Sequence, residues 1–377
     1  MKLRALVALM VLAHTAFAGG RVALTLSAIR LGATSLQVGL VVSLLALVPM
    51  LLSVHAGRWT DRRGTLRPTL LALLLLEAGL LLALLPSLGM LGASAVLLGS
   101  GFMLVHVALH NAVAAGCAPA LHPRAYALLA LGNSTSTIAG PVIAGFLLDL
   151  AGAAWTFLAL ATLPLLALCA LARAAGGMAQ PHAPGRAQGR ARVIDLLRHP
   201  PLRAVLLVSA LLSMGWDLFA FMMPVHGNAI GLPASRIGLA MGAFGAGTFV
   251  VRLFTPALAR RWSAWQVLGG ALTVAAAVYL GFPLVRSLPL LLAAAFVLGL
   301  ALGCALPTIM SAIGQAAPPG RGGEAIGIRS MLANASQTLL PVTVGAIGSA
   351  GGTQVVFWIV GGMLAVGALC AQLQPPK

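Results

Sequence analysis

Twelve long apolar stretches follow one another along this 377-residue chain, and they constrain its fold more than any other feature. A helix needs about 20 mostly apolar residues to cross the hydrocarbon core of a bilayer, and each stretch is roughly that long. We therefore predict an all-α integral membrane protein with twelve transmembrane helices. The predicted spans are residues 5–29, 36–56, 68–88, 91–117, 125–149, 154–172, 202–226, 236–258, 265–285, 288–314, 325–348 and 354–372.

Composition excludes most other classes of protein. Hydrophobic residues make up 60% of the chain and charged residues only 8%, whereas about a quarter of the residues in a soluble domain are charged. The net charge of +17 invites a nucleic-acid interpretation, but the basic residues occupy short gaps between apolar stretches and not one soluble face. We therefore predict a lipid bilayer as a partner, and no nucleic acid.

The basic residues also predict the orientation in the membrane. If the N-terminus lies inside, 17 of the 23 Lys and Arg residues fall in inner segments and three in outer segments. Cytoplasmic loops carry such an excess, so we predict a multi-pass protein of a bacterial-type inner (plasma) membrane with both termini in the cytoplasm. Ala16-Phe17-Ala18 resembles a signal-peptide cleavage site, but the apolar stretch continues to Ile29, which favours a span.

The two halves of the chain repeat each other at an offset of 199 or 200 residues. Internal repeats are a common construction of secondary transporters, whose substrate site lies between the halves near the middle of the membrane. We predict two pseudo-symmetric halves of six helices, residues 1–172 and 202–377, joined by a flexible cytoplasmic linker at 173–201. The matched pairs include Gly39 and Gly238, Arg62 and Arg261, Pro119 and Pro319, Pro141 and Pro341, Gly145 and Gly345, and Phe157 and Phe357.

The loop between the second and third spans carries a motif that begins at Gly57 and ends at Arg67. Gly57 allows two helices to approach closely, and Asp61 is an acid at a helix end that can pair with an arginine or cap a facing helix N-terminus. The string resembles the G-x-x-x-D-R-x-G-x-[RK] signature of the major facilitator superfamily. The second-half copy is degraded, with Pro256 in place of the glycine and Arg260 in place of the acid.

That resemblance implies a transporter fold in which the motif acts as a latch that holds the outward-facing state. The alternative is that the motif only enforces topology and tight packing. We expect Glu324 and Arg329, at the start of the eleventh span, to join Asp61 in an inner gate network. The predicted gating residues are Gly57, Asp61, Arg62, Arg63, Gly64, Arg67, Glu324 and Arg329.

The fifth span contains Gly140 and Pro141, followed by Gly145. A Gly-Pro pair frees backbone groups and bends a membrane helix. The pattern resembles the fifth-span motif of drug and sugar antiporters of the same superfamily, although one glycine follows where that motif has a pair. The resemblance favours export, and the alternative is a kink that serves packing alone.

Arg21 in the first span and Asp217 in the seventh are the leading candidates for the transport pathway. Ionisable groups at mid-membrane usually face a cavity or a partner, and the resemblance places both helices around a central cavity. A pair across the halves can bind an anionic or zwitterionic substrate, or couple protonation of Asp217 to closure. The alternative is a static buried ion pair. Glu77 in the third span is a second candidate proton site or a structural hydrogen-bonding group, whereas Asp149 is predicted to lie at the interface.

Further polar residues lie inside the spans. His106 and His110 share a helix face, but no Glu or Cys completes a ligand set, so we predict no metal and no cofactor. Trp216 offers an aromatic contact to an organic substrate or packs in the core. The remaining candidates for the pathway are His110 and Asn111 in the fourth span, Asn133 in the fifth and Asn334 in the eleventh.

The chain has no phosphate-binding G-x-x-x-x-G-K-[ST] loop and no clustered catalytic groups, so we predict no enzyme. The function that we expect is secondary active transport of a small organic solute by alternating access, as a monomeric, proton-coupled exporter. One alternative is a proton-coupled importer of an organic anion, in which Arg21 binds the carboxylate. An alternative of another class is a sensor or scaffold with a transporter fold.

Overall fold

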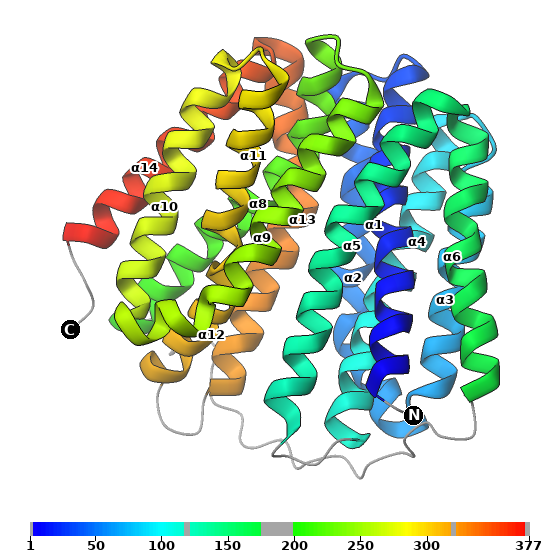
Figure 1. The fold of residues 1–377 in the computed structure, drawn as a ribbon, viewed down its shortest axis with the longest axis horizontal. Coiled ribbons are helices and arrows are strands. Elements are labelled where there is room, and N and C mark those ends of the chain that lie inside the picture. Colours follow the sequence, from blue (N-terminus) through cyan, green and yellow to red (C-terminus); the bar gives the residue numbers. More distant parts are fainter. Residues whose placement is uncertain (1–2, 117–120, 175–198, 318–321, 374–377) are drawn as a thin grey trace.

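The structure, a computed structural model, describes residues 3–116, 121–174, 199–317 and 322–373. Within these ranges every regular element is a helix. Two groups of helices stand side by side, one for each half of the chain (Figure 1). The first group comprises α1 (Leu3–Arg30), α2 (Ser35–Arg63), α3 (Leu66–Leu82), α4 (Leu88–Gly116), α5 (His122–Leu150) and α6 (Gly152–Ala174).

The second group repeats this order. Between α6 and α8 the structure describes only His199. Most of the predicted linker, residues 175–198, lies outside the described residues. The elements are α8 (Pro200–Ala229), α9 (Ala234–Arg261), α10 (Ala264–Gly281), η3 (Phe282–Leu284), α11 (Leu288–Gly303), α12 (Ala305–Ala316), α13 (Gly322–Gly351) and α14 (Thr353–Leu373).

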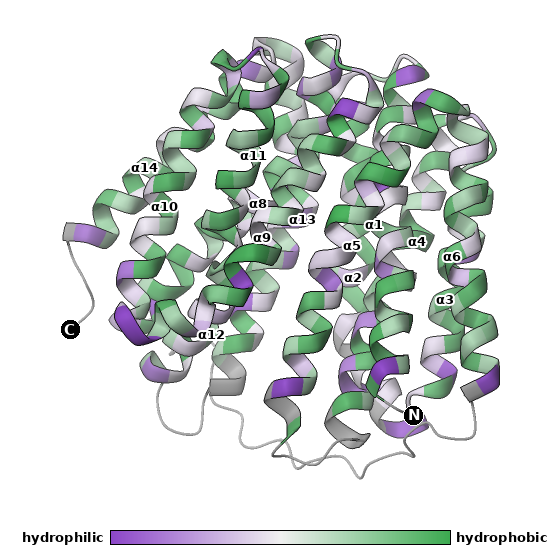
Figure 2. Ribbon diagram, viewed as in Figure 1, coloured by the Kyte–Doolittle hydropathy of each residue, from purple (hydrophilic) through white to green (hydrophobic). Residues whose placement is uncertain are grey.

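We name the two ends of the bundle by α1. The N face is the end at which α1 begins at Leu3, and the far face is the end at which it finishes at Arg30 (Figure 1). Figure 2 shows hydrophobic residues along the helices, with many of the hydrophilic ones near the two ends. Within the described ranges, ten helical segments are long and apolar enough to cross a membrane. This confirms a multi-pass membrane fold, and α3 and α13 remain the predicted additional spans.

Prolines explain where two helices differ from the predicted spans. The third span is predicted to reach residue 88, but α3 ends at Leu82. Pro86, four residues on, has no backbone N–H to donate to the Leu82 carbonyl oxygen. The tenth span is divided at Cys304 into α11 and α12. Pro307 has no backbone N–H to continue the hydrogen-bond ladder there.

The two halves meet through α5 with α9 and through α2 with α13. Small residues let these backbones touch near the far face, as is common between membrane helices. A Cβ atom built at Gly238 would lie against the carbonyl oxygen of Pro141, and one at Gly39 against that of Pro341. The conformation is therefore closed at the far face.

Candidate functional site

A cavity of about 310 Å³ lies in the second half, between the middle of the bundle and the N face. Residues of α8, α9, α11, α12 and α13 line it, and apolar side chains such as Leu212 and Ile309 form much of its wall. An intramembrane cavity lined by ionisable groups is the expected place for a transport site. Its polar lining residues are Ser213, Trp216, Asp217, Arg252, Arg329, Ser330, Asn334 and Gln337.

Asp217 is the central group of this cavity. Asp217 is only 4% exposed, and its carboxylate interacts electrostatically with Arg21 of the first half and Arg329 of its own half. Gln337 donates a hydrogen bond to the carboxylate. Asp217 Oδ2 and Arg21 Nε are nonetheless buried without a hydrogen-bond partner in the described part of the chain. Buried polar groups normally have partners, so this pair has capacity left for a ligand group or a proton.

Arg252 connects the cavity to the first half. Its Nη1 donates to Ser134 Oγ at 2.6 Å and to the Ala130 carbonyl oxygen at 3.0 Å, both on α5. Arg252 also acts electrostatically on His14 of α1, which is hydrogen-bonded to Asn133. Sequence reasoning selected Asn133, but it did not identify Ser134 or Gln337, because hydroxyl and amide residues are common in membrane helices and nothing local marks these two.

Aromatic rings form a ladder in the first half. Phe17 of α1 stacks on Phe102 of α4 at a centroid distance of 4.2 Å, and His106 stacks on His110 at 4.1 Å. His14 joins the ladder through Phe102 at 4.9 Å. The spacing of Phe102, His106 and His110 by four residues was the signal that could have revealed it. All these rings are partly exposed, and His14 interacts electrostatically with Arg252, which lines the cavity.

The other predicted pathway residues occupy different environments. Trp216 lines the cavity and packs edge-on against Phe244 at 4.8 Å. Asn334 also lines it, and Asn111 is half-buried on α4 beside His110. Glu77 is half-buried on α3 and is not among the residues that line the cavity. No group of three potential metal ligands occurs among the described residues.

The predicted gating motif is only partly visible. The side chains of Asp61 and Glu324 lie outside the described residues, so the latch remains a prediction. Gly64 ends α2 with φ 75°, a conformation that favours glycine. A Cβ at Gly57 would meet no described atom within 4 Å, and the close approach expected there remains a prediction.

The remaining gating residues are basic, and the structure places them at two depths. Arg329 lies in the cavity, and its Nε donates to Ser209 Oγ at 3.3 Å. Arg62, Arg63 and Arg67 are exposed at the N face. An arginine in a membrane cavity is costly unless a partner or ligand compensates it, so Arg329 belongs with the candidate site as well as with the predicted gate.

The fifth-span motif packs on both neighbouring helices. A Cβ at Gly140 would lie 2.7 Å from the backbone nitrogen of Gly19 in α1, and one at Gly145 would meet the carbonyl oxygen of Ala234 in α9. Pro141 lies within α5, which continues past it to Leu150. The motif therefore joins α5 to its own half on one side and to the second half on the other.

Comparison with known proteins identifies matches over the whole chain. The family model described as Major Facilitator Superfamily matches residues 6–288 and 205–377. No curated protein matches the sequence.

Solved structures of transporters share the fold at low sequence identity. A POT family transporter in complex with a thioalcohol-conjugated peptide has a TM-score of 0.83 at 15% identity, covering 100% of this chain and 96% of that one. A POT family transporter in complex with 5-aminolevulinic acid has a TM-score of 0.82 at 15% identity, with the same coverage. The nucleoside transporter NupG has a TM-score of 0.78 at 12% identity, covering 98% of this chain and 99% of that one.

Proposed function

Because the chain belongs to the major facilitator superfamily, we propose that it is a proton-coupled secondary active transporter that exports a small organic solute. The observation that carries this proposal is the electrostatic interaction between two buried charges, Arg21 of the first half and Asp217 of the second. A movement of the halves changes the distance between these charges. The protonation state of Asp217 and the position of the halves are therefore coupled by electrostatics.

The proposed cycle uses the residues of the cavity in two roles. Asp217 carries the proton. Arg21 and Arg329 stabilise its deprotonated form until the carboxylate takes up a proton or a solute group binds to the arginines. Trp216 and the apolar wall of the cavity contact the organic part of the solute. An effector moves such an equilibrium only if it binds the two conformations with different free energy, and a proton on Asp217 meets that condition.

Orientation is part of the proposal. We infer that the N face lies in the cytoplasm, because 17 of the 23 Lys and Arg residues fall in the segments that the sequence predicts on the side of the N-terminus. The cavity in the conformation described is then positioned to take up solute from the cytoplasm, as an exporter requires. The fifth-span motif, with its resemblance to that of antiporters, supports the same direction.

Proton flux in proteoliposomes tests the coupling. The protein is reconstituted with a pH-sensitive dye in the lumen, and candidate organic solutes are added one at a time to wild-type and variant vesicles. Asp217→Asn removes the ionisable group and should abolish solute-dependent proton flux, a loss of at least about 100-fold, as for other essential proton-transfer groups. Glu77→Gln should retain the flux, because Glu77 lies outside the cavity. Retained coupling in Asp217→Asn would refute the assignment.

A second function, proton-coupled import of an organic anion, is favoured by the charge of the cavity. Arg252 and Arg329 line the cavity with Asp217, the one carboxylate among its lining residues, and Arg21 of the first half acts electrostatically on that carboxylate. Excess positive charge inside a membrane is costly unless an anion compensates it. The sign of the luminal pH change separates the two functions, since symport and antiport move protons in opposite directions relative to the solute. Solute movement without proton movement would exclude both.

A further inference from the structure

The N-terminus of α9 lies at the far-face junction between the halves and has no cap of its own. Pro233 occupies the N-cap position, and its side chain makes no capping hydrogen bond. The first backbone N–H groups of a helix have no partner within the helix and carry the positive end of its dipole. A side-chain acceptor from elsewhere in the protein can therefore satisfy these N–H groups.

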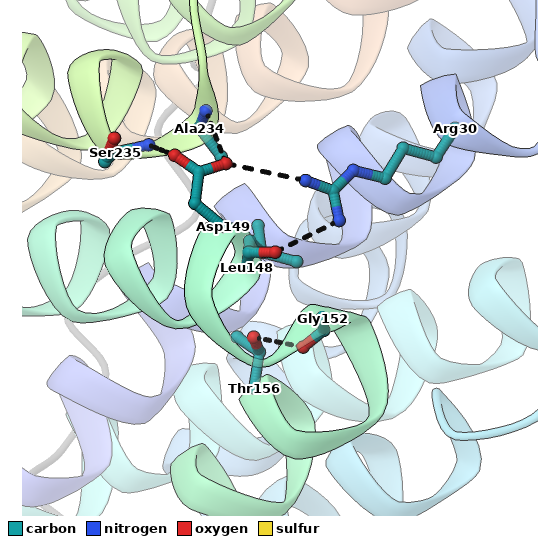
Figure 3. A network of polar contacts seen from close by, with 7 residues as sticks. All are labelled: Arg30, Leu148, Asp149, Gly152, Thr156, Ala234 and Ser235. Carbon is teal, nitrogen blue, oxygen red and sulfur yellow. Dashed lines mark hydrogen bonds and ion pairs between the residues drawn. The ribbon is translucent and has the colours of Figure 1, made fainter.

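Asp149, at the end of α5 in the other half, supplies that acceptor (Figure 3). The backbone nitrogen of Ala234 donates to Asp149 Oδ1 at 3.1 Å, and that of Ser235 donates to Oδ2 at 2.7 Å. A carboxylate that accepts two backbone N–H groups at a helix start is a favourable charge-assisted cap. Here the acceptor and the donors belong to different halves of the protein.

Arg30 completes the arrangement at the end of α1. Its Nη2 lies 3.7 Å from Asp149 Oδ1, and its Nη1 donates to the carbonyl oxygen of Leu148 at 3.3 Å. Arg30 therefore holds the end of α5 within the first half and directs the carboxylate towards α9 (Figure 3). The Arg30 side chain is 46% exposed, so its own ion pair contributes little.

We propose that Asp149 is a positioning residue of the transport cycle, a cap between the halves that forms only while the far face is closed. The proposal rests on alternating access as the proposed function. When the halves separate at the far face, the carboxylate leaves Ala234 and Ser235, and the start of α9 loses its acceptor. The cap therefore stabilises the conformation that is open towards the N face, and its loss shifts the population towards the opposite one.

Spin-label distances test this without any solute or pH gradient, so a failed substrate or coupling assignment does not affect the result. Labels at Leu85→Cys and Leu284→Cys, both exposed at the far face in different halves, report opening there. Labels at Arg124→Cys and Arg261→Cys report closure at the N face. The full chain, with its native cysteines replaced, is measured in lipid nanodiscs by pulsed electron paramagnetic resonance.

Asp149→Ala should increase the far-face-open population about tenfold, which corresponds to about 1.4 kcal/mol and is in the range for loss of a helix cap. The Leu85–Leu284 distance should lengthen as the Arg124–Arg261 distance shortens. Asp149→Asn, which keeps one acceptor oxygen and loses the charge, should give a smaller shift in the same direction. Unchanged distances in Asp149→Ala would overturn the proposal.

Two control variants separate this role from a purely structural one. Thr34→Ala removes the cap of α2, which lies within one half, and should lower the thermal stability without changing the distances. Pro233→Ser, added to Asp149→Ala, gives α9 a cap of its own in both conformations. It should restore thermal stability but leave the population shifted. If Pro233→Ser restored both, or if Asp149→Ala lowered stability alone, Asp149 would be a structural cap only.

Discussion

The junction of α5 with α9 and the junction of α2 with α13 are related by the internal repeat, yet only one carries a polar link between the halves in the described structure. Both rest on backbone contact at glycines, Gly145 against Ala234 in one and Gly345 against Ser35 in the other. The start of α2 is capped inside its own half. The start of α9 is capped by Asp149 from the opposite half.

The start of α2 is capped entirely by residues of its own segment. The backbone nitrogen of Gln37 donates to Thr34 Oγ1 at 3.3 Å, and the backbone nitrogen of Thr34 donates to Gln37 Oε1 at 2.9 Å. This reciprocal capping box is complete whether the halves are together or apart. The comparison therefore separates two contributions: shape closes both junctions equally, while charge makes only the α5–α9 junction sensitive to the separation of the halves.

The largest effect should come from disrupting the backbone contacts at glycines that both junctions share. Gly39→Val and Gly238→Val place a side chain where Pro341 and Pro141 present carbonyl oxygens. Overpacking of this kind costs about 1–3 kcal/mol or more, so far-face closure should weaken by roughly 10- to 100-fold. Both variants should increase the far-face-open population in spin-label measurements, and to similar extents.

A glycine without close neighbours provides the control for those variants. A Cβ at Gly362 of α14 would meet no described atom within 4 Å, so Gly362→Ala should leave the spin-label distances unchanged. If Gly39→Val and Gly238→Val differed strongly from each other, the idea that shape closes the two junctions equally would be wrong.

A smaller effect should follow from introducing a carboxylate cap at the α2–α13 junction. Ser349 on α13 occupies the position that corresponds to Asp149 at the repeat offset of 200 residues. Ser349→Asp alone should change little, because α2 is already capped by Thr34. In combination with Thr34→Ala it should favour far-face closure by about three- to tenfold relative to Thr34→Ala alone, as expected for a new helix cap. If the double variant and Thr34→Ala gave the same spin-label distances, the proposal that a carboxylate from the opposite half stabilises far-face closure would be weakened.

The smallest effect should come from Arg30. Exposed ion pairs contribute about 0.2–1 kcal/mol, so Arg30→Gln should increase the far-face-open population by about 1.4- to fivefold. The wild-type preference for closure should weaken with added salt because exposed charges are screened, and Arg30→Gln should be less sensitive to salt. A shift as large as that of Asp149→Ala would show that Arg30, and not the cap, provides most of the link.

Much of the fold followed from the sequence. Apolar length predicted the membrane helices, and ten of them are long and apolar enough in the structure. The motif at Gly57–Arg67 led to the family that the family model matches. Breaks such as the one at Cys304 were missed, because Pro307 sits inside an apolar stretch and hydropathy does not register a missing backbone donor.

The site was less predictable. Arg21 and Asp217 were selected because an ionisable group inside a span is rare and costly, and the structure brings them into electrostatic contact. Gln337 and Ser134 were missed, because nothing in the local sequence distinguishes them from the other amide and hydroxyl residues of α5 and α13. Asp149 was recognised only as an interfacial acid, since the residue that it caps is 85 positions away in the chain.

The sequence by itself determined that the chain is a bundle of membrane helices and which few charges lie inside it, because length, apolarity and charge act locally along each helix. It also predicted two related halves from the internal repeat. Only the tertiary structure decided which of two equivalent junctions carries the charged link. The charged link requires that the end of α5 lies against the start of α9. That contact joins residues far apart in the sequence, so only long-range packing determines it. The same Asp at a helix end would otherwise be one more solvated charge at the membrane surface.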